Sequence, residues 1–267
     1  MNLELTGRKA LVTGASKGIG RVIARTLARE GAELILCASK VESLTEIKSE
    51  FEKKGTKFWL GGFDANDPKR VEDFFSSTVT KIGRLDILVN NVGGVVDHAK
   101  FEELTERQWL DSWNLNFMTM VRFTKNSLPF LRLSKHARII NISSSAGKQP
   151  GAFNPHYGAA KAAVNSLSKY LANQLSSEKI LVNSIIPATV SDGLWFVHIA
   201  DKAKRLGVTM EEATRIMEEE IASKIPLGRV GKAEDVAELV AFLASDRAEF
   251  ITGTCIAVDG GLVKSIF

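Results

Sequence analysis

The fold is decided near the start of the chain, by the stretch Lys9-Ala10-Leu11-Val12-Thr13-Gly14-Ala15-Ser16-Lys17-Gly18-Ile19-Gly20. Residues 9–13 form a short apolar run that is typical of a buried strand, and the glycines that follow permit a tight turn. An amphipathic segment then continues to Glu30, which indicates a helix. A strand, a glycine-rich turn and a helix in this order predict the first unit of an α/β sheet.

Apolar runs and amphipathic segments alternate through the rest of the chain. The apolar runs lie at residues 33–37, 57–60, 85–90, 138–142, 180–186 and 255–258. The helical patterns cover residues 41–54, 68–82, 105–133 and 233–244, and a further helix is expected to begin near residues 154–155. This alternation predicts a Rossmann-type, doubly wound parallel sheet of about seven strands with helices on both faces. No linker divides residues 1–267, so we expect a single domain.

Composition excludes several classes of partner. The net charge is +4, from 35 basic and 31 acidic residues, and the basic residues are dispersed, which does not indicate nucleic-acid binding. Cys37 and Cys255 lie in apolar runs, which favours buried, reduced thiols over a disulfide or a metal site. The chain has neither a secretion-signal pattern at its start nor an apolar stretch approaching the roughly 18 residues of a membrane span. We therefore expect a cytoplasmic protein with no membrane or metal partner.

The stretch from Ser144 to Lys161 carries the groups best suited to chemistry. A helix is expected to begin near Asn154-Pro155, because asparagine is a good N-cap and proline suits the first helical position. Tyr157 and Lys161 then share one helix face, where the ammonium would favour the ionised phenol and lower its pKa. The same spacing also occurs on ordinary solvated helices, so the pair alone does not establish a site.

Three serines follow the predicted strand at residues 138–142. They are Ser143, Ser144 and Ser145, and they lie at the carboxyl end of that strand, where open α/β sheets bind their ligands. Chemistry alone does not say which of the three acts. The glycine turn after residue 13 lies at the same edge of the sheet, and the helix start behind it suits a phosphate group.

Together these motifs resemble the short-chain dehydrogenase/reductase family over essentially the whole chain. The resemblance rests on Thr13, Gly14, Gly18 and Gly20, then Asn90-Asn91-Val92-Gly93, and then Ser144, Tyr157 and Lys161. It implies that Tyr157 is the general acid or base, and that Ser144, thirteen residues earlier, polarises the substrate oxygen. It also implies that Lys161 stabilises tyrosinate and binds the nicotinamide ribose, and that Asn116 holds a water on the proton path.

The resemblance further implies a nicotinamide dinucleotide cofactor. The expected binding residues are Gly14, Ser16, Lys17, Gly18, Ile19, Gly20, Ser39, Lys40, Asp64, Ala65, Asn91, Gly93, Tyr157, Lys161, Pro187 and Thr189. Val92, Ala188 and Asp192 depart from the family pattern, the last two near the expected nicotinamide end. These departures leave the polar contacts to the carboxamide open, with Thr189 or Ser191 as substitutes.

The residues after the second predicted strand favour NADP(H) over NAD(H). Ala38-Ser39-Lys40 lacks the Asp or Glu that would bind the ribose hydroxyls of NAD(H). Lys17, Lys40 and the Ser39 hydroxyl could instead hold a 2′-phosphate through charge-assisted hydrogen bonds. The alternative is that both lysines are ordinary solvated surface residues.

Two segments point to a substrate lid and a subunit contact. Residues 190–225 contain an apolar cluster at 194–197 and then Met210, Ala213, Met217 and Ile221 at helical spacing. They predict a helix whose apolar face docks on the domain, or a mobile lid over the substrate. The helix at residues 105–133 is apolar on more than one side, which suggests contact with a second subunit. The resemblance implies a homodimer or homotetramer.

The sequence thus predicts an NADP(H)-dependent carbonyl reductase or secondary-alcohol dehydrogenase with a small-molecule substrate. Residues 226–229 resemble 3-oxoacyl-thioester reductases that act on acyl carrier protein, but two basic positions of those enzymes correspond to Lys135 and Glu178. An apolar ketone, a ring alcohol, sugars and polyols also remain open. A non-catalytic NADP(H)-binding regulator or scaffold is the alternative of another class. Loss of the tyrosine or lysine would mark it, and both are present.

Overall fold

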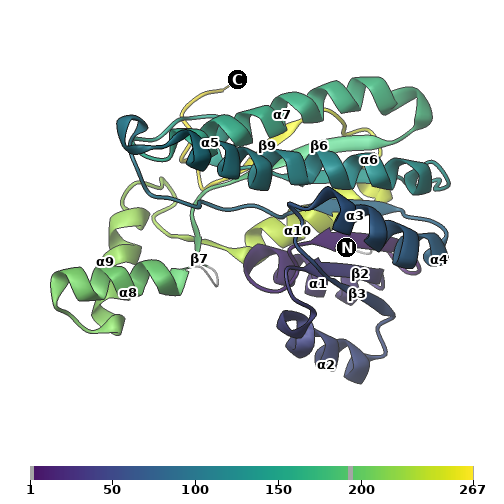
Figure 1. Ribbon diagram of the computed structural model, residues 1–267, viewed down its shortest axis with the longest axis horizontal. Helices are drawn as coiled ribbons and strands as arrows, with labels where there is room; N and C mark the ends of the chain where they lie inside the picture. The colour runs from purple at the N-terminus through teal and green to yellow at the C-terminus, as the bar shows by residue number, and fades with distance from the viewer. Residues whose placement is uncertain (1–2, 192–194, 267) are drawn as a thin grey trace.

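The computed structural model describes residues 3–191 and 195–266, with the backbone alone for residues 195–198 (Figure 1). Seven parallel strands form the main sheet in the order β3-β2-β1-β4-β5-β6-β9, which confirms the predicted sheet. These strands are β1 Lys9–Thr13, β2 Glu33–Ala38, β3 Phe58–Gly62, β4 Ile87–Asn90, β5 Arg138–Ile142, β6 Leu181–Pro187 and β9 Cys255–Val258. A separate short pair joins β7 Val190–Ser191 to β8 Gly231–Lys232.

Helices cover both faces of the sheet, as predicted. The α-helices are α1 Gly18–Arg29, α2 Thr45–Lys54, α3 Pro68–Phe74, α4 Thr80–Ile82, α5 Glu106–Trp113, α6 Thr119–Leu131, α7 Pro155–Leu175, α8 Trp195–Leu206, α9 Met210–Ala222 and α10 Ala233–Ala244. Short 3₁₀ turns are η1 Val41–Leu44, η3 Phe101–Glu103, η5 Ser145–Gly147, η6 Ser176–Glu178 and η7 Asp246–Ala248. Single π-helical turns are η2 Phe75–Val79 and η4 Asn114–Met118.

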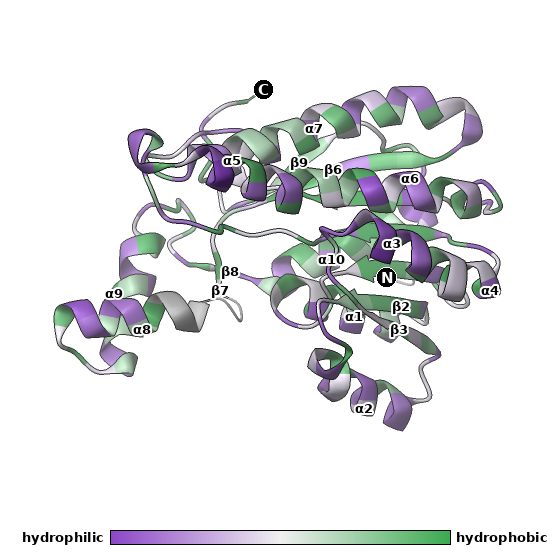
Figure 2. Cartoon of the chain, viewed as in Figure 1, coloured by the Kyte–Doolittle hydropathy of each residue, from purple (hydrophilic) through white to green (hydrophobic). Residues whose placement is uncertain are grey.

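Successive strand residues face two separate apolar cores. In β1, Ala10 and Val12 pack with the core that includes α1 and α10, whereas Leu11 packs with the core that includes α3, α6 and α7. A parallel sheet covered on both faces needs apolar residues at consecutive positions, which explains the unbroken apolar runs in the sequence. In Figure 2 the buried strand β2 has hydrophobic colour, whereas the outer helices have mixed colour.

Both long predicted helices contain a π-helical turn. The segment predicted at residues 105–133 consists of α5, η4 and α6, and the segment predicted at 68–82 consists of α3, η2 and α4. Asp67 caps α3 as the sequence suggests, since its carboxylate accepts hydrogen bonds from the backbone N–H groups of Lys69 at 2.9 Å and Arg70 at 3.3 Å. The π turn η4 carries Asn116, and such turns often occur at functional sites.

Asn154 does not cap α7, so that part of the prediction is wrong. The helix does begin at Pro155, but Asn154 has φ 60° and ψ 48° and makes no side-chain cap. Its side-chain oxygen instead accepts a hydrogen bond from the backbone N–H of Ala99 at 3.2 Å, and its amide nitrogen lies 3.2 Å from Nδ1 of His98. Asn154 therefore joins the loop after β4 to the start of α7.

Helices α8 and α9 form a hairpin that extends from the body of the molecule (Figure 1). The apolar face of α9 packs mainly on α8, with Ala213 of α9 buried against Ile199 and Ala203 of α8, and Met210 at the start of α9 is 46% exposed. Within the part of the chain that the structure describes, this apolar cluster is completed by Val208 and Val230, and the face of α9 does not join the two cores of the main sheet. A salt bridge between Lys202 and Glu220 also joins the two helices. The predicted apolar cluster at 194–197 and Asp192 lie outside the described residues or side chains.

The described residues also bear on the cysteines, on membrane-spanning helices and on metal sites. Cys37 is buried, Cys255 is partly buried, and neither forms a disulfide. Burial raises the pKa of the Cys37 thiol to about 12, so the thiol stays protonated at neutral pH. Among the helices that the structure describes, none has the length and apolar character needed to span a bilayer. Within residues 3–191 and 195–266, no group of three His, Cys, Asp or Glu side chains is arranged to hold a metal ion.

Candidate active site

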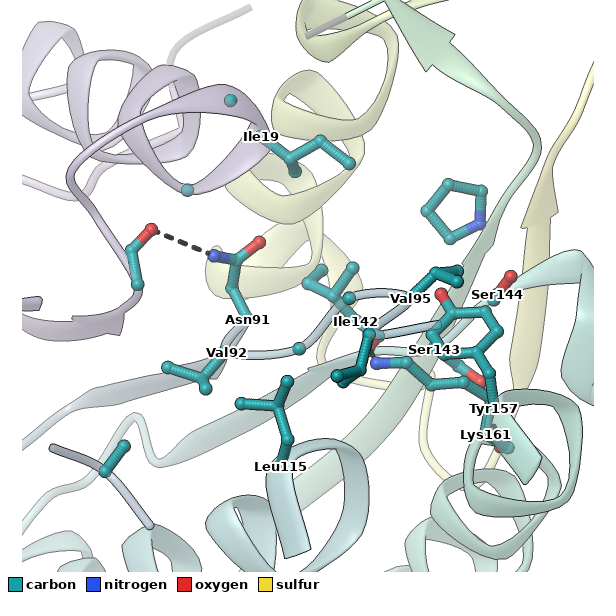
Figure 3. Close-up of a pocket in the computed structure, with 18 of the residues that line it drawn as sticks. Ile19, Asn91, Val92, Val95, Leu115, Ile142, Ser143, Ser144, Tyr157 and Lys161 are labelled. Carbon is teal, nitrogen blue, oxygen red and sulfur yellow. Dashed lines mark hydrogen bonds between the residues drawn. The ribbon is translucent and has the colours of Figure 1, made fainter. Parts of the chain in front are cut away.

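A cleft of about 840 Å³ runs along the carboxyl ends of the central strands. It crosses the point between β1 and β4 where the strand order reverses, which is where open α/β sheets bind their ligands. Figure 3 shows Ser144, Tyr157 and Lys161 gathered in one part of the cleft and Ile19 and Asn91 in another. The tertiary fold therefore brings the serine, the tyrosine–lysine helix and the glycine turn to one cavity.

The glycine turn forms one wall of this cleft. Gly14 and Gly18 have φ values of 67° and 56°, which residues with side chains rarely adopt. A Cβ atom on Gly20 would lie 2.4 Å from both the backbone oxygen of Gly14 and Nδ2 of Asn91, so no side chain fits there. Helix α1 begins at Gly18 and presents free N–H groups beside this wall. A phosphate group fits this arrangement of close backbone, N–H donors and positive dipole end.

Thr13 joins this turn to the loop that follows β4. Its hydroxyl oxygen accepts hydrogen bonds from the backbone N–H groups of Asn91 at 2.9 Å and Val92 at 3.1 Å. The Asn91 side chain donates in return to the backbone oxygens of Thr13 at 2.9 Å and Gly14 at 3.2 Å, one of the contacts visible in Figure 3. Val92 lines the cleft without closing it. The two loops therefore form one rigid wall.

The end of the cleft beside β2 contains no carboxylate from that strand. Ala38 and Ser39 line it, with Lys17 from the glycine turn and Asp64 and Ala65 from the loop after β3. Lys17 and Ser39 are exposed, so both can reach a bound anion. Lys40 is exposed and does not line the cleft, so its part in binding a 2′-phosphate stays a prediction.

Ser144 and Tyr157 face each other at the other end. Ser144 follows β5 in extended conformation, and its hydroxyl accepts a hydrogen bond from the backbone N–H of Ala146 at 3.2 Å. Removal of the Tyr157 phenol from water raises its pKa, and a side-chain hydrogen bond with Ser144 opposes this effect. The predicted lowering of the phenol pKa is therefore wrong for this structure, because burial outweighs the stabilisation of tyrosinate.

Lys161 lies under the tyrosine ring and is only 3% exposed. Its Nζ atom is 5.8 Å from the centre of the Tyr157 ring and donates a hydrogen bond to the backbone oxygen of Ile142 at 2.9 Å. Burial lowers the pKa of this lysine to about 8, so its ammonium can lose a proton near neutral pH. A lysine in this state suits proton transfer better than a solvated one does.

Asn116 is buried and holds the loop after β4 instead of lining the cleft. Its side chain accepts a hydrogen bond from the backbone N–H of Gly94 at 2.8 Å and donates to the backbone oxygens of Gly94 at 3.0 Å and Ser112 at 3.1 Å. A Cβ atom on Gly93 would lie 2.7 Å from Oδ1 of Asn116 and 3.0 Å from Nζ of Lys161. Asn116 and Lys161 thus meet across Gly93, and the water between them stays a prediction.

Comparison with known proteins agrees with this geometry. Residues 14–263 match the sequence model of a protein family described as enoyl-(acyl carrier protein) reductase. The chain is 34% identical over 262 residues to the 3-oxoacyl-[acyl-carrier-protein] reductase FabG of Escherichia coli, covering 98% of this chain and 99% of that one. The Thermotoga maritima FabG is 31% identical over 261 residues, covering 98% and 100%. The chain belongs to the short-chain dehydrogenase/reductase family.

A solved structure of another short-chain dehydrogenase/reductase extends the likeness to the whole fold. The L-sorbose reductase of Gluconobacter frateurii, complexed with NADPH and L-sorbose, has a TM-score of 0.93 and 31% sequence identity. The match covers 100% of both chains. As a member of this family, the protein is an oxidoreductase.

Most predicted site residues of this dehydrogenase/reductase line the cleft. The exceptions are Lys40 and Asn116. Sequence reasoning missed several lining residues that carry no motif, among them four from the loops after β4 and β5. Their only signal is that these loops follow strand carboxyl ends. They are Val95, Val96, Phe153 and Asn154.

Proposed function

We propose that this protein is an NADP(H)-dependent oxidoreductase that reduces a carbonyl compound or oxidises the corresponding secondary alcohol. The observation that carries the proposal is the meeting of Ser144, Tyr157 and Lys161 in the same cleft as the glycine turn. Bound NADPH would supply the hydride. The NADPH complex of the L-sorbose reductase, which shares the whole fold, supports this choice of cofactor.

The residues of the chain account for binding the cofactor. The glycine turn and the start of α1 would hold the diphosphate, and Lys17 and Ser39 would hold the 2′-phosphate. Ala38, at the end of β2, leaves no negative charge to repel that phosphate. Pro187 at the end of β6 and Thr189 just after it line the cleft, where the family places the nicotinamide.

The catalytic side chains account for the proton transfer. Ser144 donates a hydrogen bond to the substrate oxygen and polarises the carbonyl group. Tyr157 donates its phenolic proton to the same oxygen, and in the oxidative direction it removes the proton from the alcohol. Lys161 stabilises the tyrosinate that remains, and its low pKa lets it pass a proton onward. We expect the water held near Asn116 to return that proton from solvent.

The substrate is best described as a small ketone or its alcohol. The walls beside Tyr157 combine apolar side chains, Val95, Val96 and Phe153, with the polar Asn154. The curated relatives named above favour a 3-oxoacyl thioester on acyl carrier protein as the second candidate. Against it, Glu178 stands at a position that is basic in such enzymes and forms hydrogen bonds with Arg132 at 2.5 and 3.1 Å. That ion pair removes positive charge that an acidic carrier would need.

A substrate panel tests both candidates. Purified protein is incubated with NADPH or NADH and with ketones, 3-oxoacyl thioesters, ketoses and, in the reverse direction, secondary alcohols and polyols. Loss or gain of reduced-nicotinamide absorbance reports turnover. We expect turnover with NADPH and a free ketone. Turnover confined to carrier-bound thioesters would select the second candidate, and cofactor binding without turnover of any compound would favour a non-catalytic regulator.

We also propose a homodimer or homotetramer in the cytoplasm. Leu110 and Trp113 on α5 are 57% and 39% exposed, and such exposed apolar side chains favour contact with a second subunit. The α8–α9 hairpin would act as a lid of the single domain, closing over the substrate end of the cleft. Sedimentation velocity measures the assembly, and a monomer at micromolar concentration would contradict this part of the proposal.

A further inference from the structure

The turn that carries Ser144 lies directly on helix α7, with no room between them. A Cβ atom on Gly147 would lie 2.6 Å from the backbone carbon of Lys161 and 2.8 Å from the backbone nitrogen of Ala162. On the helix side, a Cβ atom on Gly158 would lie 3.1 Å from the backbone oxygen of Ala146. Two glycines thus allow the backbone of the turn and the backbone of the helix to touch.

Polar contacts hold the same two segments together. The hydroxyl of Ser143 donates to the backbone oxygen of Lys161 at 3.1 Å. The side-chain amide of Asn165 donates to the backbone oxygen of Gly147 at 3.3 Å. Residues 158, 161 and 165 share one face of α7, because helix positions three and four apart are neighbours. The turn is therefore attached to the helix at both ends, on either side of Ser144.

We propose that Gly147 and Asn165 are positioning residues, which fix the Ser144 hydroxyl against the Tyr157 phenol by holding its turn on α7. The inference rests on the proposed oxidoreductase function. Neither residue lines the cleft, and both act through Ser144. Within the turn, the Ser144 hydroxyl accepts a hydrogen bond from the backbone N–H of Ala146, and the Ser144 backbone oxygen accepts one from the backbone N–H of Gly147 at 3.0 Å. Ser144 is thus fixed to its turn, and the attachment of that turn to α7 sets its distance from Tyr157.

The consequence is a coupling between this contact and the acidity of Tyr157. The hydrogen bond with Ser144 lowers the pKa of the phenol against the effect of burial. An alanine at position 147 must push the turn away from α7, because the contacts at 2.6 and 2.8 Å are with backbone atoms that cannot rotate aside. A misplacement of about 1 Å in a catalytic group can cost roughly 10²-fold in rate.

Three variants form a graded series with a matched control. Gly147→Ala inserts a methyl group into the contact, Gly158→Ala inserts one where the space is less tight, and Asn165→Ala removes the hydrogen bond without adding volume. Asn173→Ala makes the same change on an exposed part of α7 and is the control. We expect kcat to fall most in Gly147→Ala and less in the other two variants. KM for the substrate and the dissociation constant for NADPH should stay close to wild type, and the control should match wild type.

A tyrosine titration gives a readout that needs neither substrate nor cofactor. The chain has two tyrosines, and Tyr170 is 62% exposed, so a Tyr170→Phe background leaves Tyr157 as the only one. Ultraviolet absorbance of tyrosinate should show Tyr157 ionising at higher pH in Gly147→Ala and Asn165→Ala than in the background protein. The pH at which alcohol oxidation rises should move in the same direction.

The outcomes separate the positioning role from a structural one. A Tyr157 titration that matches the background in both variants overturns the proposal, whatever their activity. Activity that falls only in proportion to lost folded protein, measured by circular dichroism, also overturns it. If Gly147→Ala does not fold, Asn165→Ala decides. If the wild type turns over no compound, the proposed function fails, while the titration still tests the position of Ser144.

Discussion

The buried ammonium of Lys161 should make the stability of the apoprotein depend on pH in a defined direction. The folded-state pKa is about 8, against an ordinary value of 10.5, because burial penalises the charged form. Between these two values the unfolded chain holds the proton and the folded chain does not. The free energy of unfolding therefore rises with pH over this window, because at lower pH the folded protein must bury a charged ammonium. Lys161→Met removes this dependence.

The magnitude follows from the size of the pKa difference. The full penalty is roughly 3 kcal/mol at 1.36 kcal/mol per pKa unit, and nearly all of it is present near pH 7. It falls to about 2 kcal/mol near pH 9 and below about 1 kcal/mol near pH 10. Methionine also leaves the Ile142 oxygen without its donor, which costs about 1–3 kcal/mol at every pH. The prediction therefore concerns how the difference in free energy of unfolding between Lys161→Met and wild type changes with pH. It does not concern the size of that difference at one pH.

Denaturant unfolding at a fixed protein concentration, without cofactor, measures this difference. The free energy of unfolding of Lys161→Met minus that of wild type should fall by about 1 kcal/mol between about pH 7 and about pH 9. Tyr157 is present in both proteins, so its own titration largely cancels. Lys40→Met, at an exposed lysine outside the cleft, controls for the loss of one positive charge. A difference that stays constant over this range would refute the reasoning.

Three further substitutions address the other parts of the cleft. Tyr157→Phe should retain NADPH binding, measured by fluorescence, and lose turnover by several orders of magnitude; near-wild-type activity would overturn the mechanism. Thr13→Val leaves the N–H groups of Asn91 and Val92 unpaired, so thermal or denaturant unfolding should show a loss of about 2–4 kcal/mol and weaker NADPH binding, whereas unchanged stability would contradict the role of its hydroxyl. Lys17→Ala should raise KM for NADPH about tenfold, equivalent to roughly 1.4 kcal/mol, and leave KM for NADH nearly unchanged. An equal effect on both cofactors, or a wild-type preference for NADH, would argue against a 2′-phosphate site.

The sequence was informative wherever neighbours along the chain decide the structure. Residues 9–20 predicted the strand, turn and helix that the structure contains, and the alternating pattern predicted the seven-stranded sheet. The motif spacing also selected Ser144, Tyr157 and Lys161, which line one cleft. Local signals were less reliable at Asn154, because its side chain accepts a hydrogen bond from the backbone N–H of Ala99 and does not cap the helix.

The state of the catalytic groups depended on contacts between distant segments. The sequence places Lys161 four residues after Tyr157, and this spacing predicted a lower phenol pKa. In the structure, burial raises the pKa of the phenol and lowers the pKa of the lysine. The Lys161 ammonium donates a hydrogen bond to the backbone oxygen of Ile142. The apolar face of α9 likewise packs on α8, although the sequence pattern gave only the face and not its partner.

By itself, the sequence determined the order of strands and helices and the residue types at the site, because hydrophobic periodicity, glycine turns and motif spacing are local properties of the chain. Only the tertiary structure decided which of these residues meet, how deeply Tyr157 and Lys161 are buried, and how closely the Gly147 turn lies on α7. Burial and backbone contact arise between segments far apart in sequence. They set the desolvation and the hydrogen bonds that determine the acidity of the catalytic groups.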